Sequence, residues 1–137
     1  KLKQKFTSEF IHTKCSPYFA HEVLMSHLKE SEIRLAVASN SISNTVELAM
    51  NYTHLGRFME FYLSNEDVKK PKPDPEIYNL AIKRLGVDKS EVLIVEDNIN
   101  GIKAAKASGA HIIEVGSVED VTISNIRKKI NQINDLK

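Results

Sequence analysis

Ser39 and Asn40 are the first residues whose types could do chemistry, because they follow an apolar run and lead into a helical pattern. A hydroxyl group beside the unpaired backbone N–H groups of a helix N-terminus forms a site for an anion such as phosphate. The alternative is that residues 39–44 only cap the helix. The segment alone does not separate these two interpretations.

A second segment is crowded with lysines and prolines. Lys69, Lys70 and Lys72 lie beside Pro71 and Pro73. Because the prolines restrict the backbone, they could hold one ammonium group close to a phosphate. The alternative is a solvated basic turn before a helix.

The third feature is the pair of carboxylates Glu96 and Asp97, which follow the apolar run 92–95. Carboxylates at the end of a buried parallel strand can bind a hard cation such as Mg²⁺ through oxygen. They can also face solvent or cap the next helix, so the metal interpretation depends on its surroundings.

Strand and helix patterns alternate along the chain and would position these residues. This order predicts an α/β fold with a three-layer, doubly wound parallel sheet, in which ligands bind beyond the carboxyl ends of the strands. Asp74 and Pro75 predict the start of one helix, and Gly86 predicts its end. We expect strands at 33–38, 58–63, 92–95 and 111–115, and helices at 20–29, from Ser43 or Asn44, at 75–85, at 99–108 and at 123–133.

The composition excludes several classes of protein. The 137 residues carry 19 Lys and Arg against 18 Asp and Glu, so no overall charge favours nucleic acid as a partner. No apolar stretch is long enough to span a membrane. Cys15 is the only cysteine, which suits a reducing compartment, and we expect a cytoplasmic location.

Taken together and in order, the three segments resemble the second, third and fourth motifs of the haloacid dehalogenase-like (HAD) phosphatases. The similarity is greatest to the group that includes phosphoglycolate phosphatase and beta-phosphoglucomutase. It implies a Rossmann-type core and an Mg²⁺-dependent phosphohydrolase or phosphomutase that acts on a small phosphorylated metabolite through an aspartyl-phosphate. The motifs are ASNS at 38–41, KKPKPDPEIY at 69–78 and VLIVEDNINGIKAAKASG at 92–109.

The resemblance also implies roles for individual residues. Ser39 and the backbone amide of Asn40 would bind the phosphoryl group. Lys70 would neutralise the phosphate and the nucleophile as the catalytic lysine, since it begins the Lys-Pro-x-Pro-Asp run. Glu96 and Asp97 would hold Mg²⁺, directly or through water.

One family feature is absent from the sequence. Family members carry a nucleophilic Asp-x-Asp motif on the first strand, but these 137 residues contain no Asp-x-Asp, and the earliest aspartate is Asp67. The resemblance places that strand between the strands 33–38 and 92–95, so its absence would expose two strand edges. Residues 1–16 would then be the remnant of a helical cap or linker, and 17–137 the C-terminal part of the core domain.

These considerations leave two hypotheses. In the first, the chain is a fragment of a phosphohydrolase with its nucleophile elsewhere, and it has little or no turnover. In the second, it is a non-catalytic phosphate-binding or interaction module that forms a dimer or pairs with another chain through an exposed sheet edge.

Overall fold

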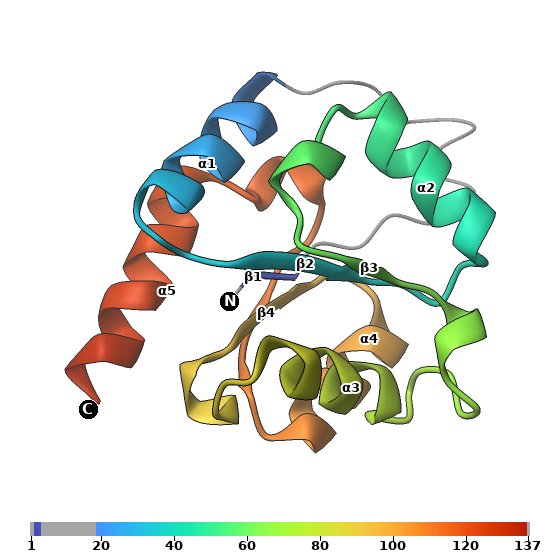
Figure 1. The fold of residues 1–137 in the computed structure, drawn as a ribbon. Helices are drawn as coiled ribbons and strands as arrows, with labels where there is room; N and C mark the ends of the chain where they lie inside the picture. The colour runs from blue at the N-terminus through green and yellow to red at the C-terminus, as the bar shows by residue number, and fades with distance from the viewer. Residues whose placement is uncertain (1, 4–18, 137) are drawn as a thin grey trace.

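The computed structural model describes residues 2–3 and 19–136 of the chain. Helices and strands alternate along these residues, as Figure 1 shows. The strands are β1 (Leu2–Lys3), β2 (Leu35–Ala38), β3 (Tyr62–Leu63), β4 (Leu93–Glu96) and β5 (His111–Glu114). The α-helices are α1 (Phe19–Glu30), α2 (Ser43–Tyr52), α3 (Glu76–Leu85), α4 (Ile99–Ser108) and α5 (Ile123–Asp135), and short 3₁₀ turns include η3 (Asn65–Asp67).

All the described strand pairs are parallel. β2 pairs with β1 on one side and with β3 on the other, and β4 pairs with β5. β1 also contacts β4. Parallel strands need crossover connections, and the helices between β2, β3, β4 and β5 supply them. The predicted α/β fold with a parallel sheet is confirmed.

β1 corrects the expectation of two exposed strand edges between β2 and β4. Leu2 pairs with Leu35 and Lys3 with Ala36, so β1 covers the beginning of β2 while contacting β4. The edge is covered there because these two residues of the chain pair with it. The rest of the segment 1–16 predicted as a cap remnant or linker, residues 1 and 4–16, lies outside the described residues.

The sheet separates two apolar layers, because successive strand residues point to opposite faces. Leu35 and Val37 of β2 pack with α1, α2 and Ile126 of α5. Ala38 of β2 and Ile94 of β4 pack with α3 and α4 on the other face. Figure 1 shows these helices on either side of the strands, and the predicted three layers are therefore confirmed.

Most helix boundaries agree with the prediction, and two capping details matter. α3 and α4 end before Gly86 and Gly109, which take left-handed φ values of 67° and 81° that favour glycine. α2 begins at Ser43, as expected, but neither Ser43 nor Asn44 is its N-cap residue. Its N-cap is Ile42, without a side-chain hydrogen bond, and the carboxylate of Glu66 accepts from the Ser43 amide at 2.8 Å.

The predicted strand 58–63 is much shorter in the structure, where only Tyr62 and Leu63 pair with β2. Among residues 2–3 and 19–136, none of the helices is both long and apolar enough to cross a membrane.

Candidate functional site

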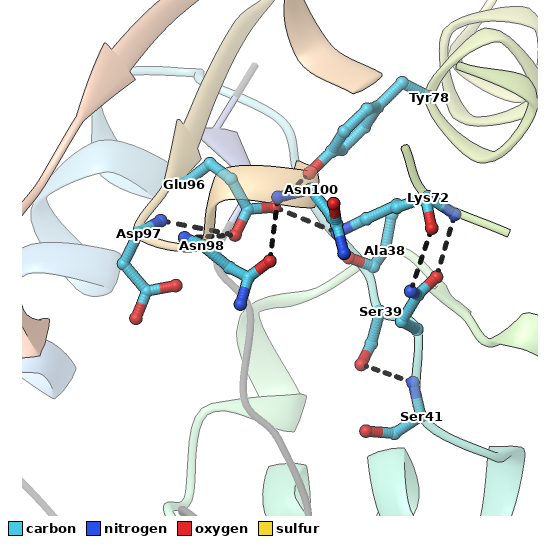
Figure 2. A network of polar contacts seen from close by, with 10 residues as sticks. Ala38, Ser39, Ser41, Lys72, Tyr78, Glu96, Asp97, Asn98 and Asn100 are labelled. Atoms are coloured by element: carbon cyan, nitrogen blue, oxygen red, sulfur yellow. Dashed lines mark hydrogen bonds and ion pairs between the residues drawn. The ribbon is translucent and has the colours of Figure 1, made fainter. Parts of the chain in front are cut away.

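The carboxyl ends of β2 and β4 bring two of the predicted segments together. β2 ends at Ala38 and leads into Ser39, and β4 ends at Glu96 and leads into Asp97. The loop before α3 supplies Lys72, whose side chain reaches both strand ends (Figure 2). This edge of a parallel sheet is where ligands bind in open α/β folds.

Lys72 and Glu96 form a buried ion pair at this edge. The Nζ of Lys72 lies 2.9 Å from Oε2 of Glu96 and donates to the carbonyl oxygen of Ala38 at 3.0 Å. Both side chains are fully buried, with 0% of their surface exposed. Burying two charges costs free energy that only good geometry and further hydrogen bonds offset, so this arrangement constrains the orientation of both groups.

The side chain of Asn40 holds the backbone of Lys72. Its Oδ1 accepts from the Lys72 amide at 3.0 Å, and its Nδ2 donates to the Lys72 carbonyl at 3.4 Å, a longer contact. The sequence predicted a phosphate-binding role for Asn40 through its backbone amide. The clamp on Lys72 is a side-chain role that the sequence did not reveal.

The structure places Lys72, and not the predicted Lys70, at the strand ends. Lys70 is exposed, and its amide donates to Glu76 Oε1 at 3.2 Å, while the amide of Lys69 donates to Glu76 Oε2 at 2.9 Å. Glu76 in the first turn of α3 therefore holds this part of the loop at the surface. Asn40 holds the next part, with Lys72, against β2, while the catalytic role expected for Lys70 stays a prediction.

The Glu96 carboxylate accepts hydrogen bonds from side chains and from backbone amides. Oε2 accepts from Lys72 and, at 2.5 Å, from the hydroxyl of Tyr78 in α3. Oε1 accepts from the amides of Asp97 at 3.2 Å and Asn98 at 3.4 Å. The carboxylate is thus oriented through both of its oxygens.

Gly101 in α4 makes room for the Glu96 side chain. A Cβ atom at position 101 would lie 2.0 Å from Cδ and 2.1 Å from Oε2 of Glu96, which is far inside van der Waals contact. The absence of a Cβ atom at position 101 therefore lets the Glu96 carboxylate lie against α4.

Asp97 is exposed, and Figure 2 shows its carboxylate directed away from Lys72 and Tyr78. It does not cap α4. Asn98 is the N-cap, and its side chain accepts from the Asn100 amide at 2.9 Å. Helix capping, one of the alternative roles for Glu96 and Asp97, is performed by their neighbour.

Ser39 lies at the same edge and is buried, with 1% of its surface exposed. Its amide continues the ladder to β3 by donating to the carbonyl of Leu63 at 3.0 Å, and its Oγ accepts from the Ser41 amide at 3.1 Å. The Ser39–Ser41 turn thus brings a hydroxyl group and backbone amides together where β2 meets α2.

The carboxylates of Glu96 and Asp97 suit a metal ion whose other ligands are water or substrate oxygens. Within the described part of the chain, no group of three or more His, Cys, Asp and Glu residues is arranged to hold a metal. Mg²⁺ is commonly bound through one or two carboxylates together with water and phosphate oxygens, and the exposed carboxylate of Asp97 is suited to that role.

The fold and the site together define a class: a three-layer α/β domain with a lysine, a hydroxyl group and two carboxylates at the carboxyl edge of its sheet. Residues 1–115 match the haloacid dehalogenase-like hydrolase family. The chain belongs to this family.

Two of the curated relatives that the chain is similar to are named as phosphatases. The chain is 36% identical over 85 residues to pyrophosphatase PpaX of Bacillus velezensis and 32% identical over 85 residues to a phosphorylated carbohydrates phosphatase of Thermotoga maritima. Each alignment covers 62% of this chain and 39% of the relative. The chain thus spans well under half the length of either relative.

A solved structure has the same fold. CbbY from Rhodobacter sphaeroides, determined in complex with phosphate, superposes with a TM-score of 0.68 at 25% sequence identity. The match covers 80% of this chain and 51% of that chain.

Proposed function

We propose that this chain supplies the phosphate-binding and metal-binding part of an Mg²⁺-dependent phosphohydrolase or phosphomutase that acts on a small phosphorylated metabolite. The observation that carries the proposal is the buried Lys72–Glu96 pair beside Ser39 at the carboxyl edge of the sheet. Membership in the family and the phosphatase names of the relatives support the same reaction class.

Phosphoryl transfer asks a protein mainly for positioning and for positive charge near the phosphoryl oxygens. Lys72 would supply that charge without touching the phosphoryl group, since a charge in a region of low dielectric acts over several ångströms. The hydroxyl of Ser39 and the amide of Asn40 would donate to the phosphoryl oxygens. Lys72 takes the role that the sequence predicted for Lys70.

Asp97 would hold Mg²⁺, with Glu96 assisting directly or through water as the sequence predicted. When bound, the ion would add positive charge near the phosphoryl group. Because Glu96 already accepts from Lys72 and Tyr78, we propose that its main role is to orient the lysine.

The nucleophile in this proposal lies outside the 137 residues, which contain no Asp-x-Asp. We therefore expect the chain alone to bind phosphate without hydrolysing p-nitrophenyl phosphate. Adding a segment with an apolar strand ending in Asp-x-Asp would restore Mg²⁺-dependent hydrolysis. Equal hydrolysis by the chain with and without that segment would contradict this assignment.

Binding of inorganic phosphate, measured by calorimetry with and without Mg²⁺, tests the site itself. We expect binding in the presence of Mg²⁺, and a loss of the Mg²⁺ effect in Asp97→Asn. The matched control is Asp135→Asn, which changes an exposed aspartate at the end of α5. An equal Mg²⁺ effect in both variants would exclude Asp97 as the ligand.

The choice of lysine has its own test. Lys72→Met should weaken phosphate binding about tenfold or more, and Lys70→Met should leave it unchanged, because only Lys72 brings its charge to the strand ends. Lys72→Met removes the cationic partner of the buried Glu96 carboxylate, which typically lowers the free energy of unfolding by about 3–5 kcal/mol. Folding of this variant is therefore checked by circular dichroism. Lys72→Arg, which keeps the charge, provides a second variant, and a loss of binding confined to Lys70→Met would overturn the assignment.

The absence of Asp-x-Asp from these residues favours one alternative, a non-catalytic phosphate-binding or interaction module. That function predicts phosphate binding without hydrolysis even when an Asp-x-Asp segment is added.

A further inference from the structure

Tyr78 is a polar residue on an otherwise apolar helix face. The other buried residues of α3 are Ile77, Ala81 and Leu85, whose side chains need only packing. Tyr78 is 1% exposed, and its hydroxyl group is buried between α3 and the end of β4. A buried hydroxyl costs free energy unless it finds a hydrogen-bond partner. Here the partner is Glu96, so the hydroxyl is tied to the functional site.

Tyr78 contacts both members of the buried ion pair. Its hydroxyl donates to Glu96 Oε2, the oxygen that also accepts from Lys72, and the Nζ of Lys72 lies 4.7 Å from the centre of the Tyr78 ring. Figure 2 shows the three side chains converging between α3 and the two strand ends. One tyrosine therefore supports the carboxylate through its hydroxyl and the ammonium through its ring.

The hydroxyl is suited to donate. A phenol O–H can donate one hydrogen bond, and here it lies within hydrogen-bond distance of the Glu96 carboxylate. A neutral O–H that donates to a carboxylate forms a charge-assisted hydrogen bond, which is stronger than one between neutral groups. A phenylalanine would fill the same space and remove the Tyr78 donor from Oε2, which also accepts from Lys72.

We propose that Tyr78 is a positioning residue, whose hydroxyl orients the Glu96 carboxylate and thereby holds the Lys72 ammonium at the strand ends. This inference rests on the proposed function, in which Lys72 supplies the positive charge for phosphate. Tyr78 itself does not touch the substrate in this arrangement.

Tyr78→Phe tests the proposal, because it removes the hydroxyl and keeps the ring. Tyr62→Phe is the matched control, since Tyr62 is a half-buried tyrosine on β3 next to Gly56. The readout is the nuclear magnetic resonance signal of the lysine Cε–Hε groups in the 137-residue chain, with the Lys72 signal assigned by its disappearance in Lys72→Arg. We expect this signal to move toward the signals of exposed lysines in Tyr78→Phe and to stay in place in Tyr62→Phe.

Phosphate affinity in the presence of Mg²⁺ provides the functional readout. We expect Tyr78→Phe to bind inorganic phosphate roughly tenfold more weakly, as misplacement of a charged group predicts, while Tyr62→Phe binds as the unmodified chain does. Unfolding by urea, measured for both variants, separates this effect from a general loss of stability.

The outcomes distinguish this proposal from the proposed function. An unchanged Lys72 signal in Tyr78→Phe overturns the positioning role, as does a moved signal with unchanged phosphate affinity. If the unmodified chain does not bind phosphate, the proposed function fails, and the Lys72 signal alone decides whether Tyr78 positions the lysine.

Discussion

Gly101 shows how closely the site is packed at the scale of single residues. The side chain of Glu96 occupies the space where any larger residue at position 101 would place its Cβ atom. The orientation of Glu96 therefore depends on a glycine in the neighbouring helix as well as on its hydrogen-bond donors.

We expect Gly101→Ala to destabilise the fold, because the new methyl group would displace the Glu96 carboxylate from Lys72. Overpacking of this kind typically costs about 1–3 kcal/mol, which outweighs the gain in helix propensity of about 1 kcal/mol from glycine to alanine. Urea unfolding measures the change. Lys103→Ala, at an exposed position of the same helix, is the control, and equal stability of the two variants would contradict the prediction.

The side-chain hydrogen bonds from Asn40 to the Lys72 backbone can be tested by a single substitution. In Asn40→Asp the donor to the Lys72 carbonyl becomes an acceptor, while Oδ1 still faces the Lys72 amide. We expect phosphate binding to weaken several-fold through displacement of the Lys72 loop, with Asn51→Asp, an exposed position on α2, as the control. Calorimetry measures the affinity, and unchanged binding in Asn40→Asp would show that the side-chain clamp is not needed.

At the scale of elements, α2 begins with help from a residue distant in the sequence. Glu66, in the 3₁₀ turn η3, accepts from the Ser43 amide, and a carboxylate is favourable at the positive end of a helix. This contact joins the turn after β3 to the helix after β2. It therefore also fixes the Ser39–Ser41 turn, which leads into that helix.

Glu66→Ala should destabilise the start of α2 by about 0.5–2 kcal/mol, the usual effect of removing an N-terminal cap. Hydrogen exchange of the first-turn amides of α2 would become faster, and urea unfolding would give the overall change. Glu47→Ala, which removes an exposed carboxylate from the middle of α2, is the comparison. Equal exchange rates in the two variants would exclude a capping role for Glu66.

At the scale of the whole molecule, the site lies where separate parts of the fold meet. β2, β4 and the loop before α3 each contribute to it, so the site exists only when the sheet and the α3 layer are assembled. A ligand that binds this site should therefore stabilise the whole described fold.

We expect Mg²⁺ and inorganic phosphate together to raise the urea midpoint more than either does alone. A ligand that binds only the folded state raises the free energy of unfolding by about 2.7 kcal/mol when its concentration is 100 times its dissociation constant. Sodium chloride at matched ionic strength controls for screening. If Asp97→Asn were stabilised by Mg²⁺ and phosphate as much as the unmodified chain, the gain in stability would come from another site.

Much of this architecture could be predicted from local patterns. Apolar runs and glycine positions predicted α4 at 99–108, the end of α3 at Gly86 and the parallel α/β class, because helix period, strand period and left-handed caps are properties of neighbouring residues. The same patterns placed Ser39 and Glu96 at strand ends. The short β3 was predicted too long, because pairing partners and not propensity decide where a strand ends.

The sequence by itself thus determined the class of fold, the family and the two strand ends where the polar residues lie. Only the tertiary structure decided which of three nearby lysines reaches those strand ends. Lys69, Lys70 and Lys72 have the same charge and lie within four positions of one another. They differ in contacts with Tyr78 and with Asn40 and Glu96, and the last two are distant in the chain. Burial of an ion pair depends on how α3 packs against the sheet, and that packing is not encoded in any short segment.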